Sequence, residues 1–147
     1  MKIVIASDHA GLALKAELLE LMRGKGHTVD DLGAFSGESV DYPDFASRAS
    51  KAVAGGEADR GVLVCGTGIG MSIVANKHKG VRAALCTSEF EARMSRAHND
   101  ANVLCLGQRV VGGGLARAIL EAFLEQPFEG GRHEKRVQKI RDVEAEE

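Results

Sequence analysis

Short apolar runs alternate with longer stretches of helical periodicity along the whole chain. The apolar runs predict five strands, at residues 2–7, 27–32, 61–65, 81–86 and 103–106. Helical spacing, capping residues and glycine stops predict helices over residues 11–24, 41–54, 88–97, 112–125 and 132–144, and a further helix from the glycine-rich turn after residue 65 to about residue 77. These repeated β-α units predict one α/β domain that spans residues 1–147.

The spacing of apolar residues also predicts which helix faces are buried. In the first helix, the residues expected on the inward face are Leu12, Ala16, Leu19 and Met22. In the helix over 112–125, they are Leu115, Ile119, Ala122 and Phe123. The last helix is strongly charged and has few core positions, so we expect it to be an arm that docks on a partner subunit.

Nearly continuous apolar strands are typical of a parallel sheet covered by helices on both faces. The predicted fold is therefore a Rossmann-like three-layer sandwich, with a five-stranded, mainly parallel sheet and a C-terminal helical arm. Ligands of such folds bind at the carboxyl edge of the sheet, where the helices that follow the strands begin. Three segments are predicted to lie on that edge: Asp8-His9, Cys65-Gly66-Thr67 and Gly107-Gln108-Arg109.

Composition excludes several classes of partner. With 19 basic and 21 acidic residues the net charge is −2, which argues against a nucleic-acid surface or a polybasic membrane tail. The three cysteines do not form a disulfide pattern, and no segment has the length of a membrane span, so we expect a cytoplasmic protein. The histidines have no carboxylate or cysteine partners at metal-binding spacing, so we expect no metal.

The segment over residues 62–72 is the most informative part of the chain. An apolar run ends in Cys65, and Gly66, Gly68 and Gly70 follow at every second position. Such glycines let a ligand approach the backbone, whose free amides can hold an anion, and Thr67 adds a hydroxyl. The spacing fits neither a nucleoside triphosphate loop nor a dinucleotide fingerprint.

A cysteine at a strand end is more often a small buried hydrophobic residue than a reactive group. We accept that interpretation for Cys86 and Cys105, which have no glycine turn beside them. For Cys65 the adjoining glycines favour a role as base or nucleophile.

Two polar pairs can converge on the glycine loop. Asp8-His9 closes the first strand, although Asp8 could simply cap a helix. His98-Asn99 ends a helix, where a histidine complements the helix dipole and an asparagine can form the C-terminal stop.

Three arginines suit a phosphate monoester. Arg132 and Arg136 are four residues apart and share one helix face, and Arg109 follows a strand. The alternative for the helical pair is an ordinary solvated charged face.

The motifs together form an ordered set that runs from the first strand to the last helix. They are Ser7-Asp8-His9-Ala10-Gly11, Asp41-Tyr42-Pro43, Cys65-Gly66-Thr67-Gly68-Ile69-Gly70-Met71-Ser72, Ser95-Arg96-Ala97-His98-Asn99-Asp100, Gly107-Gln108-Arg109-Val110-Val111-Gly112 and Gly130-Gly131-Arg132-His133. The set resembles ribose-5-phosphate isomerase B, in the family that also holds the galactose- and allose-phosphate isomerases. One branch of that family uses a glutamate after the last loop glycine as base. Here Met71 occupies that position and Cys65 is present, so the chain resembles the thiol users.

The resemblance implies interconversion of ribose 5-phosphate and ribulose 5-phosphate through an enediolate, with no cofactor. It implies that Cys65 is the base, that His98 opens the sugar ring with Asp8 and Thr67 nearby, and that each site is built from two subunits of a homodimer or a dimer of dimers. The remaining substrate-binding residues that it implies are His9, Tyr42, Gly66, Gly68, Ile69, Gly70, Asn99, Arg109, Arg132 and Arg136.

Two alternatives stay open on the sequence. The same residues could isomerise a six-carbon sugar 6-phosphate of the allose or galactose type. The chain could also bind a phosphosugar without chemistry, because parallel α/β folds host many functions.

Overall fold

Strands and helices alternate along the chain in the predicted order. The structure is a computed structural model that describes residues 1–147. Its elements are β1 (Lys2–Ser7), the 3-10 turn η1 (His9–Gly11), α1 (Leu12–Gly24), β2 (Thr28–Asp31), α2 (Tyr42–Ala54), β3 (Arg60–Cys65), α3 (Ile69–Ala75), β4 (Ala83–Leu85), α4 (Glu89–Asn99), β5 (Val103–Gly107), α5 (Gly113–Glu125) and α6 (Arg132–Ala145).

The five strands form one sheet in the order β2-β1-β3-β5-β4, and every neighbouring pair is parallel. The predicted Rossmann-like α/β sheet is therefore confirmed. The chain leaves β1 toward β2 on one side and returns to β3 on the other, so the crossovers diverge between β1 and β3. Such a switch point leaves a crevice at the carboxyl ends of the two strands.

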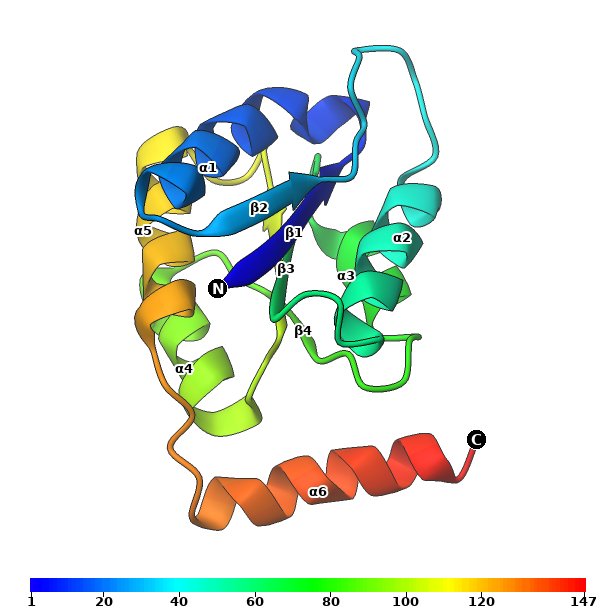
Figure 1. Ribbon diagram of the computed structural model, residues 1–147, viewed down its shortest axis with the longest axis vertical. Coiled ribbons are helices and arrows are strands. Elements are labelled where there is room, and N and C mark those ends of the chain that lie inside the picture. The colour runs from blue at the N-terminus through cyan, green and yellow to red at the C-terminus, as the bar shows by residue number, and fades with distance from the viewer.

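Helices cover both faces of the sheet (Figure 1), with α1, α4 and α5 on one face and α2 and α3 on the other. Alternate side chains of each strand point to opposite faces, so Ile3 and Ile5 join the first core while Val4 and Ala6 join the second. Cys65 belongs to the second core, beside α2 and α3.

The predicted inward faces of two helices need correction. In α1 the buried residues are Leu14, Lys15, Leu18 and Met22, so of the four expected residues only Met22 is fully buried. The buried face follows Leu14, Leu18 and Met22, which are four residues apart. Lys15 lies beside them, and its buried ammonium pairs with Asp31 at 2.8 Å. In α5, Ile119, Ala122 and Phe123 are buried as expected, but Leu115 is 42% exposed.

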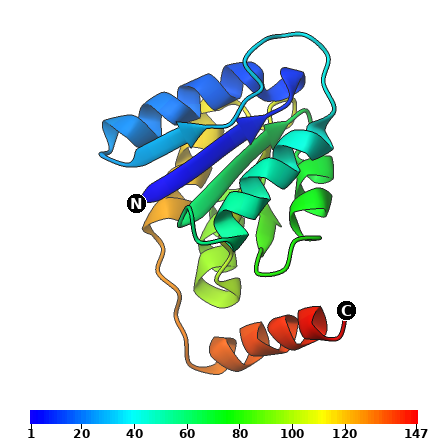
Figure 2. The ribbon, with the colours of Figure 1, turned by 45° about the vertical axis from the view of Figure 1, so that its right-hand side comes forward.

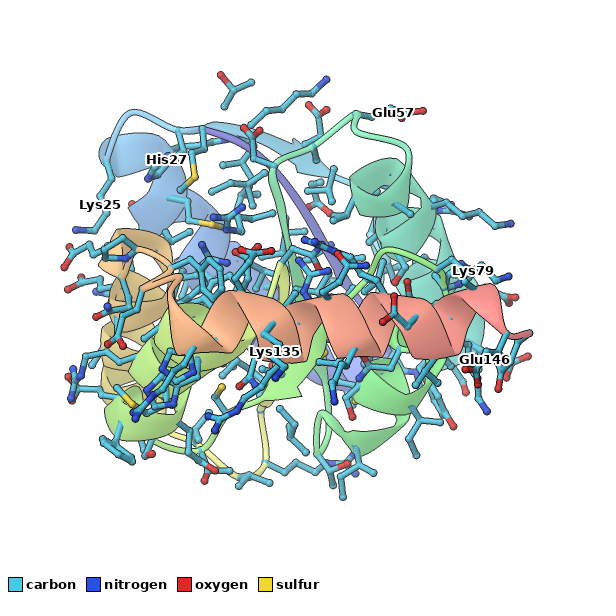
Figure 3. All side chains as sticks on the ribbon, turned by 90° about the horizontal axis from the view of Figure 1, so that it is seen from below. Lys25, His27, Glu57, Lys79, Lys135 and Glu146 are labelled. Carbon is cyan, nitrogen blue, oxygen red and sulfur yellow. The ribbon has the colours of Figure 1, made fainter.

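Helix α6 lies across the amino ends of the strands, apart from the three layers (Figure 2). Seen from that end, it crosses in front of the rest of the molecule, with Lys135 on its length (Figure 3). Glu144 near its C-terminus accepts the Gly80 N–H at 3.1 Å, and its N-terminal His133 stacks on His98 of α4. No helix of the structure combines the length and apolarity needed to cross a membrane.

Candidate active site

The carboxyl ends of β1, β3 and β5 bring three of the predicted motifs together. In the sheet register Ser7 lies opposite Val64, and Cys65 lies opposite Gly107. The Asp8 N–H donates to the Val64 carbonyl at 3.3 Å, which extends the β1–β3 pairing by one residue. Asp8 and Cys65 are therefore neighbours at the switch point, as the strand order requires.

The Cys65 sulfur faces the glycine loop. Its Sγ accepts the Gly68 N–H at 3.1 Å, although the residue as a whole is only 5% exposed. Gly68 has φ of +79°, and a Cβ at this position would lie 2.5 Å from the Leu85 side chain. Only glycine fits both the left-handed backbone and the space, so the loop that holds the sulfur depends on Gly68.

Three backbone amides of the loop remain free to bind a ligand. The Ile69 N–H donates to Thr67 Oγ1 at 3.3 Å, and Gly68 is used by the sulfur. The N–H groups of Gly66, Thr67 and Gly70 have no acceptor within the chain. Unpaired amides at the start of a helix can stabilise negative charge.

The other two cysteines are core residues, as predicted. Cys86 and Cys105 are buried, and neither lies beside a glycine turn. Burial raises the pKa of Cys86 to about 12. Burial likewise raises the pKa of Cys105 far above its ordinary value, helped by the neighbouring thiols Cys65 and Cys86. Both core thiols therefore stay protonated near neutral pH.

Asp8 and His9 each have one functional atom engaged and one free. Asp8 Oδ1 accepts the N–H groups of Ala10 and Gly11 at 2.9 and 3.1 Å, so the expected helix cap exists, while Oδ2 has no partner in the chain. His9 Nδ1 lies 3.2 Å from the Val40 N–H, which donates to it. The hydrogen of a neutral His9 is therefore on Nε2, where it can donate to an anion.

Two larger side chains border the loop. A Cβ on Gly70 would lie 2.5 Å from the Tyr42 ring, so the ring packs directly on that glycine. A Cβ on Gly66 would lie 3.4 Å from Arg109 Nη1, which places the guanidinium over the start of the loop. Tyr42 and Arg109 thus flank the free amides on an accessible surface.

The remaining predicted residues lie at the other end of the strands. His98 and Asn99 form the end of α4, just before β5 begins at Val103, whereas Cys65 pairs with Gly107 at the end of β5. Four strand residues separate these ends, or roughly 13 Å along the strand. The prediction that the His98 pair converges on the glycine loop is therefore wrong within one chain.

Arg132 and Arg136 belong to the same distant group. Both are exposed in α6, which lies across the amino ends of the strands. Asp100 rather than Asn99 takes the left-handed conformation that ends α4, with φ of +47°. Asn99 is therefore not the helix stop, and its exposed side chain is free for another role.

A cluster that the sequence analysis did not assign surrounds His98. The rings of His98 and His133 stack with centroids 4.1 Å apart, and Glu129 Oε2 lies 4.0 Å from His98 Nε2 and 3.5 Å from His133 Nε2. Ligand atoms of these three residues lie within 4.8 Å of one another. The rings are within 11° of parallel, so both nitrogens cannot point at one ion unless a ring turns. The four-residue spacing of Glu129 and His133 after α5 was the available signal.

Comparison with known proteins shows the family of the chain. The family model described as Ribose/Galactose Isomerase matches residues 3–140. The chain belongs to the ribose/galactose isomerase family. Ribose-5-phosphate isomerase B of Escherichia coli is 49% identical over 97% of this chain and 96% of that protein.

Solved structures of the family superpose over the whole chain. A ribose-5-phosphate isomerase B of Clostridium thermocellum is 53% identical, with a TM-score of 0.98 and coverage of 99% of both chains. The Mycoplasma genitalium enzyme with bound ribulose-5-phosphate is 45% identical, with a TM-score of 0.96 over 99% of this chain and 97% of that one. The fold of this isomerase family is therefore shared from β1 to α6.

Proposed function

We propose that the protein interconverts ribose 5-phosphate and ribulose 5-phosphate through an enediolate, without a cofactor, and with Cys65 as the base. Membership of the isomerase family supports the reaction class. The observation that carries the residue assignment is the Cys65 sulfur, held 3.1 Å from the Gly68 amide beside free loop amides.

The loop supplies the base for the proton transfer and the groups that stabilise the enediolate. As a thiolate, Cys65 takes the proton from C2 of the open-chain aldose, and the electron pair moves to the carbonyl oxygen on C1. Returning the proton to C1, while the C2 hydroxyl proton moves to the C1 oxygen, gives the ketose. The free amides of Gly66 and Gly70 and the Thr67 hydroxyl stabilise the enediolate, where one such donor is worth roughly 3 kcal/mol.

Ring opening and phosphate binding use the remaining residues. We assign His98 to proton transfer during ring opening, with the free oxygen of Asp8 beside the loop. His9 binds the phosphate through its Nε2–H. The guanidinium groups of Arg109, Arg132 and Arg136 bind the other phosphate oxygens. Ile69 and Tyr42 line the pocket, and Asn99 holds sugar hydroxyls.

A complete site on this assignment requires two copies of the chain. Cys65 lies at the carboxyl edge and His98 near the amino edge, so one chain cannot bring both to one sugar. A second copy can present its α4 end and α6 arm to the glycine loop of the first. Ile140 and Val143, which are 40% and 58% exposed on that arm, suit a subunit contact. We therefore propose a homodimer or a dimer of dimers.

A substrate panel with one variant tests the function. The wild type is expected to turn over ribose 5-phosphate with a higher kcat/KM than allose 6-phosphate or galactose 6-phosphate. The variant C65A should fold and lose about 10²- to 10⁴-fold in turnover, while the core control C86A keeps wild-type turnover. If C65A retains wild-type turnover, Cys65 is not the base. If the wild type has a higher kcat/KM for a six-carbon sugar 6-phosphate, that sugar is the preferred substrate. If the wild type neither turns over any of these sugars nor incorporates deuterium from heavy water into them, the protein only binds a phosphosugar.

A further inference from the structure

The loop between α5 and α6 brings a carboxylate and a second imidazole to His98. The Glu129 N–H donates to the carbonyl of Ala97 at 3.1 Å, which fixes the backbone of Glu129 beside the last turn of α4. Gly130 and Gly131 then turn the chain with φ of +66° and +55°. Helix α6 begins directly afterwards, so His133 lies in its first turn.

We propose that Glu129 and His133 are positioning residues that hold the His98 imidazole in one orientation for ring opening. This inference rests on the proposed role of His98. Stacking at 4.1 Å and 11° fixes the plane of the His98 ring. The carboxylate of Glu129 lies nearest Nε2 of His98, which leaves Nδ1 to face a substrate.

The burial of the two rings differs in the way this assignment requires. The His98 side chain is 38% exposed and can contact a sugar. His133 is only 5% exposed, and its ring packs against one face of the His98 ring. Burial lowers the pKa of His133, and the nearby His98 and Arg132 act in the same direction. His133 is therefore neutral near pH 7. A half-exposed imidazole without a ring stacked on it samples several orientations. Misplacement of a reacting group by about 1 Å can lower the rate about 10²-fold.

The chemistry of the two sugars separates positioning from a general structural effect. Ribose 5-phosphate enters mainly as a ring, so its conversion needs ring opening. Ribulose 5-phosphate cannot close a five-membered ring, because the required hydroxyl is esterified with phosphate. Exchange of its C1 hydrogens with heavy water therefore needs the proposed base Cys65 but no ring opening.

The test compares five full-length variants in both assays. We expect E129Q to lower turnover of ribose 5-phosphate by roughly 10-fold, a part of the ~10²- to 10⁴-fold that a positioned acid or base supplies. Deuterium exchange into ribulose 5-phosphate should stay near the wild-type rate. H98N should show the same selective loss to a larger extent, and E129D should recover part of the turnover. The matched control is E134Q, because Glu134 is exposed in the first turn of α6 and its carboxylate pairs with Arg141, away from His98.

Each other outcome overturns the proposal in a distinguishable way. If H98N shows the selective loss while E129Q behaves as E134Q does, Glu129 has no positioning role and the proposed function stands. If E129Q loses turnover and exchange equally, its effect is structural. If H98N keeps full turnover of ribose 5-phosphate, the proposed role of His98 itself fails. H133N should repeat the selective loss of E129Q; its melting temperature is measured first, because His133 is buried. If H133N folds and keeps full turnover, His133 does not position His98.

Discussion

Replacing Gly68 with alanine tests the geometry that holds the Cys65 sulfur. A non-glycine residue at φ of +79° costs about 1–2 kcal/mol in the folded state. The new Cβ would also lie 2.5 Å from Leu85 and 3.0 Å from the carbonyl carbon of Leu106. Overpacking of this kind adds ~1–3 kcal/mol, so G68A should lower the free energy of unfolding by roughly 2–5 kcal/mol. Displacement of the Gly68 amide should also cut turnover by about 10-fold or more.

The matched control is G26A. Gly26 has φ of +89°, but nothing lies within 4 Å of a Cβ built there, so this variant carries the backbone cost alone. Urea unfolding of both variants at pH 7, followed by far-UV circular dichroism, measures the difference. An unfolding free energy for G68A equal to that of G26A would refute the close approach of the loop to β4 and β5.

Three further predictions concern pH and the loop border. The pKa of Cys86, raised by burial to about 12, favours the protonated folded state, so stability is complete below pH 9 and is lost as pH rises toward 12. Cys86 should account for roughly 1 kcal/mol of the unfolding free energy lost between pH 8 and pH 10 in urea titrations, and C86A should remove that part of the loss. Burial lowers the pKa of His133, so its contribution to the free energy of unfolding is present above pH 6.5 and is lost as pH falls. H133N should therefore reduce the loss of stability with falling pH in urea unfolding. An unchanged dependence of stability on pH would contradict the burial of a neutral His133. G70A places a Cβ 2.5 Å from the Tyr42 ring and should raise KM by up to about tenfold with little change in kcat; an unchanged KM removes Tyr42 from the pocket.

Local patterns were sufficient to predict the sheet and the carboxyl-edge half of the site. The strand that ends at Cys65 and the glycines that follow it are adjacent in sequence, so their geometry is set by a few neighbouring residues. Asp8 was placed correctly because parallel strands end at one edge of a sheet. The same rule applies in reverse to His98, because the helix that precedes β5 must end at the amino edge. The sequence therefore contained the signal that His98 could not reach Cys65 in its own chain.

Tertiary contacts explain what the sequence did not reveal. The burial of Lys15 in α1 could not be predicted from the local pattern, because its ammonium pairs with Asp31, 16 positions later in the chain. His133 gave no signal of burial, because the ring that covers it is His98, 35 positions earlier in the chain. Pairings between distant residues leave no local period for a sequence pattern to show.

Mixing two inactive variants tests the shared site most directly. C65A lacks the base and H98N lacks the ring-opening group, and each variant keeps the other residue. After joint unfolding and refolding of equal amounts, half of the dimers are hybrids, and each hybrid has one site with both residues. The account predicts recovery of about a quarter of the wild-type turnover of ribose 5-phosphate. No recovery, with hybrid dimers shown to form, would contradict a site built from two copies of the chain.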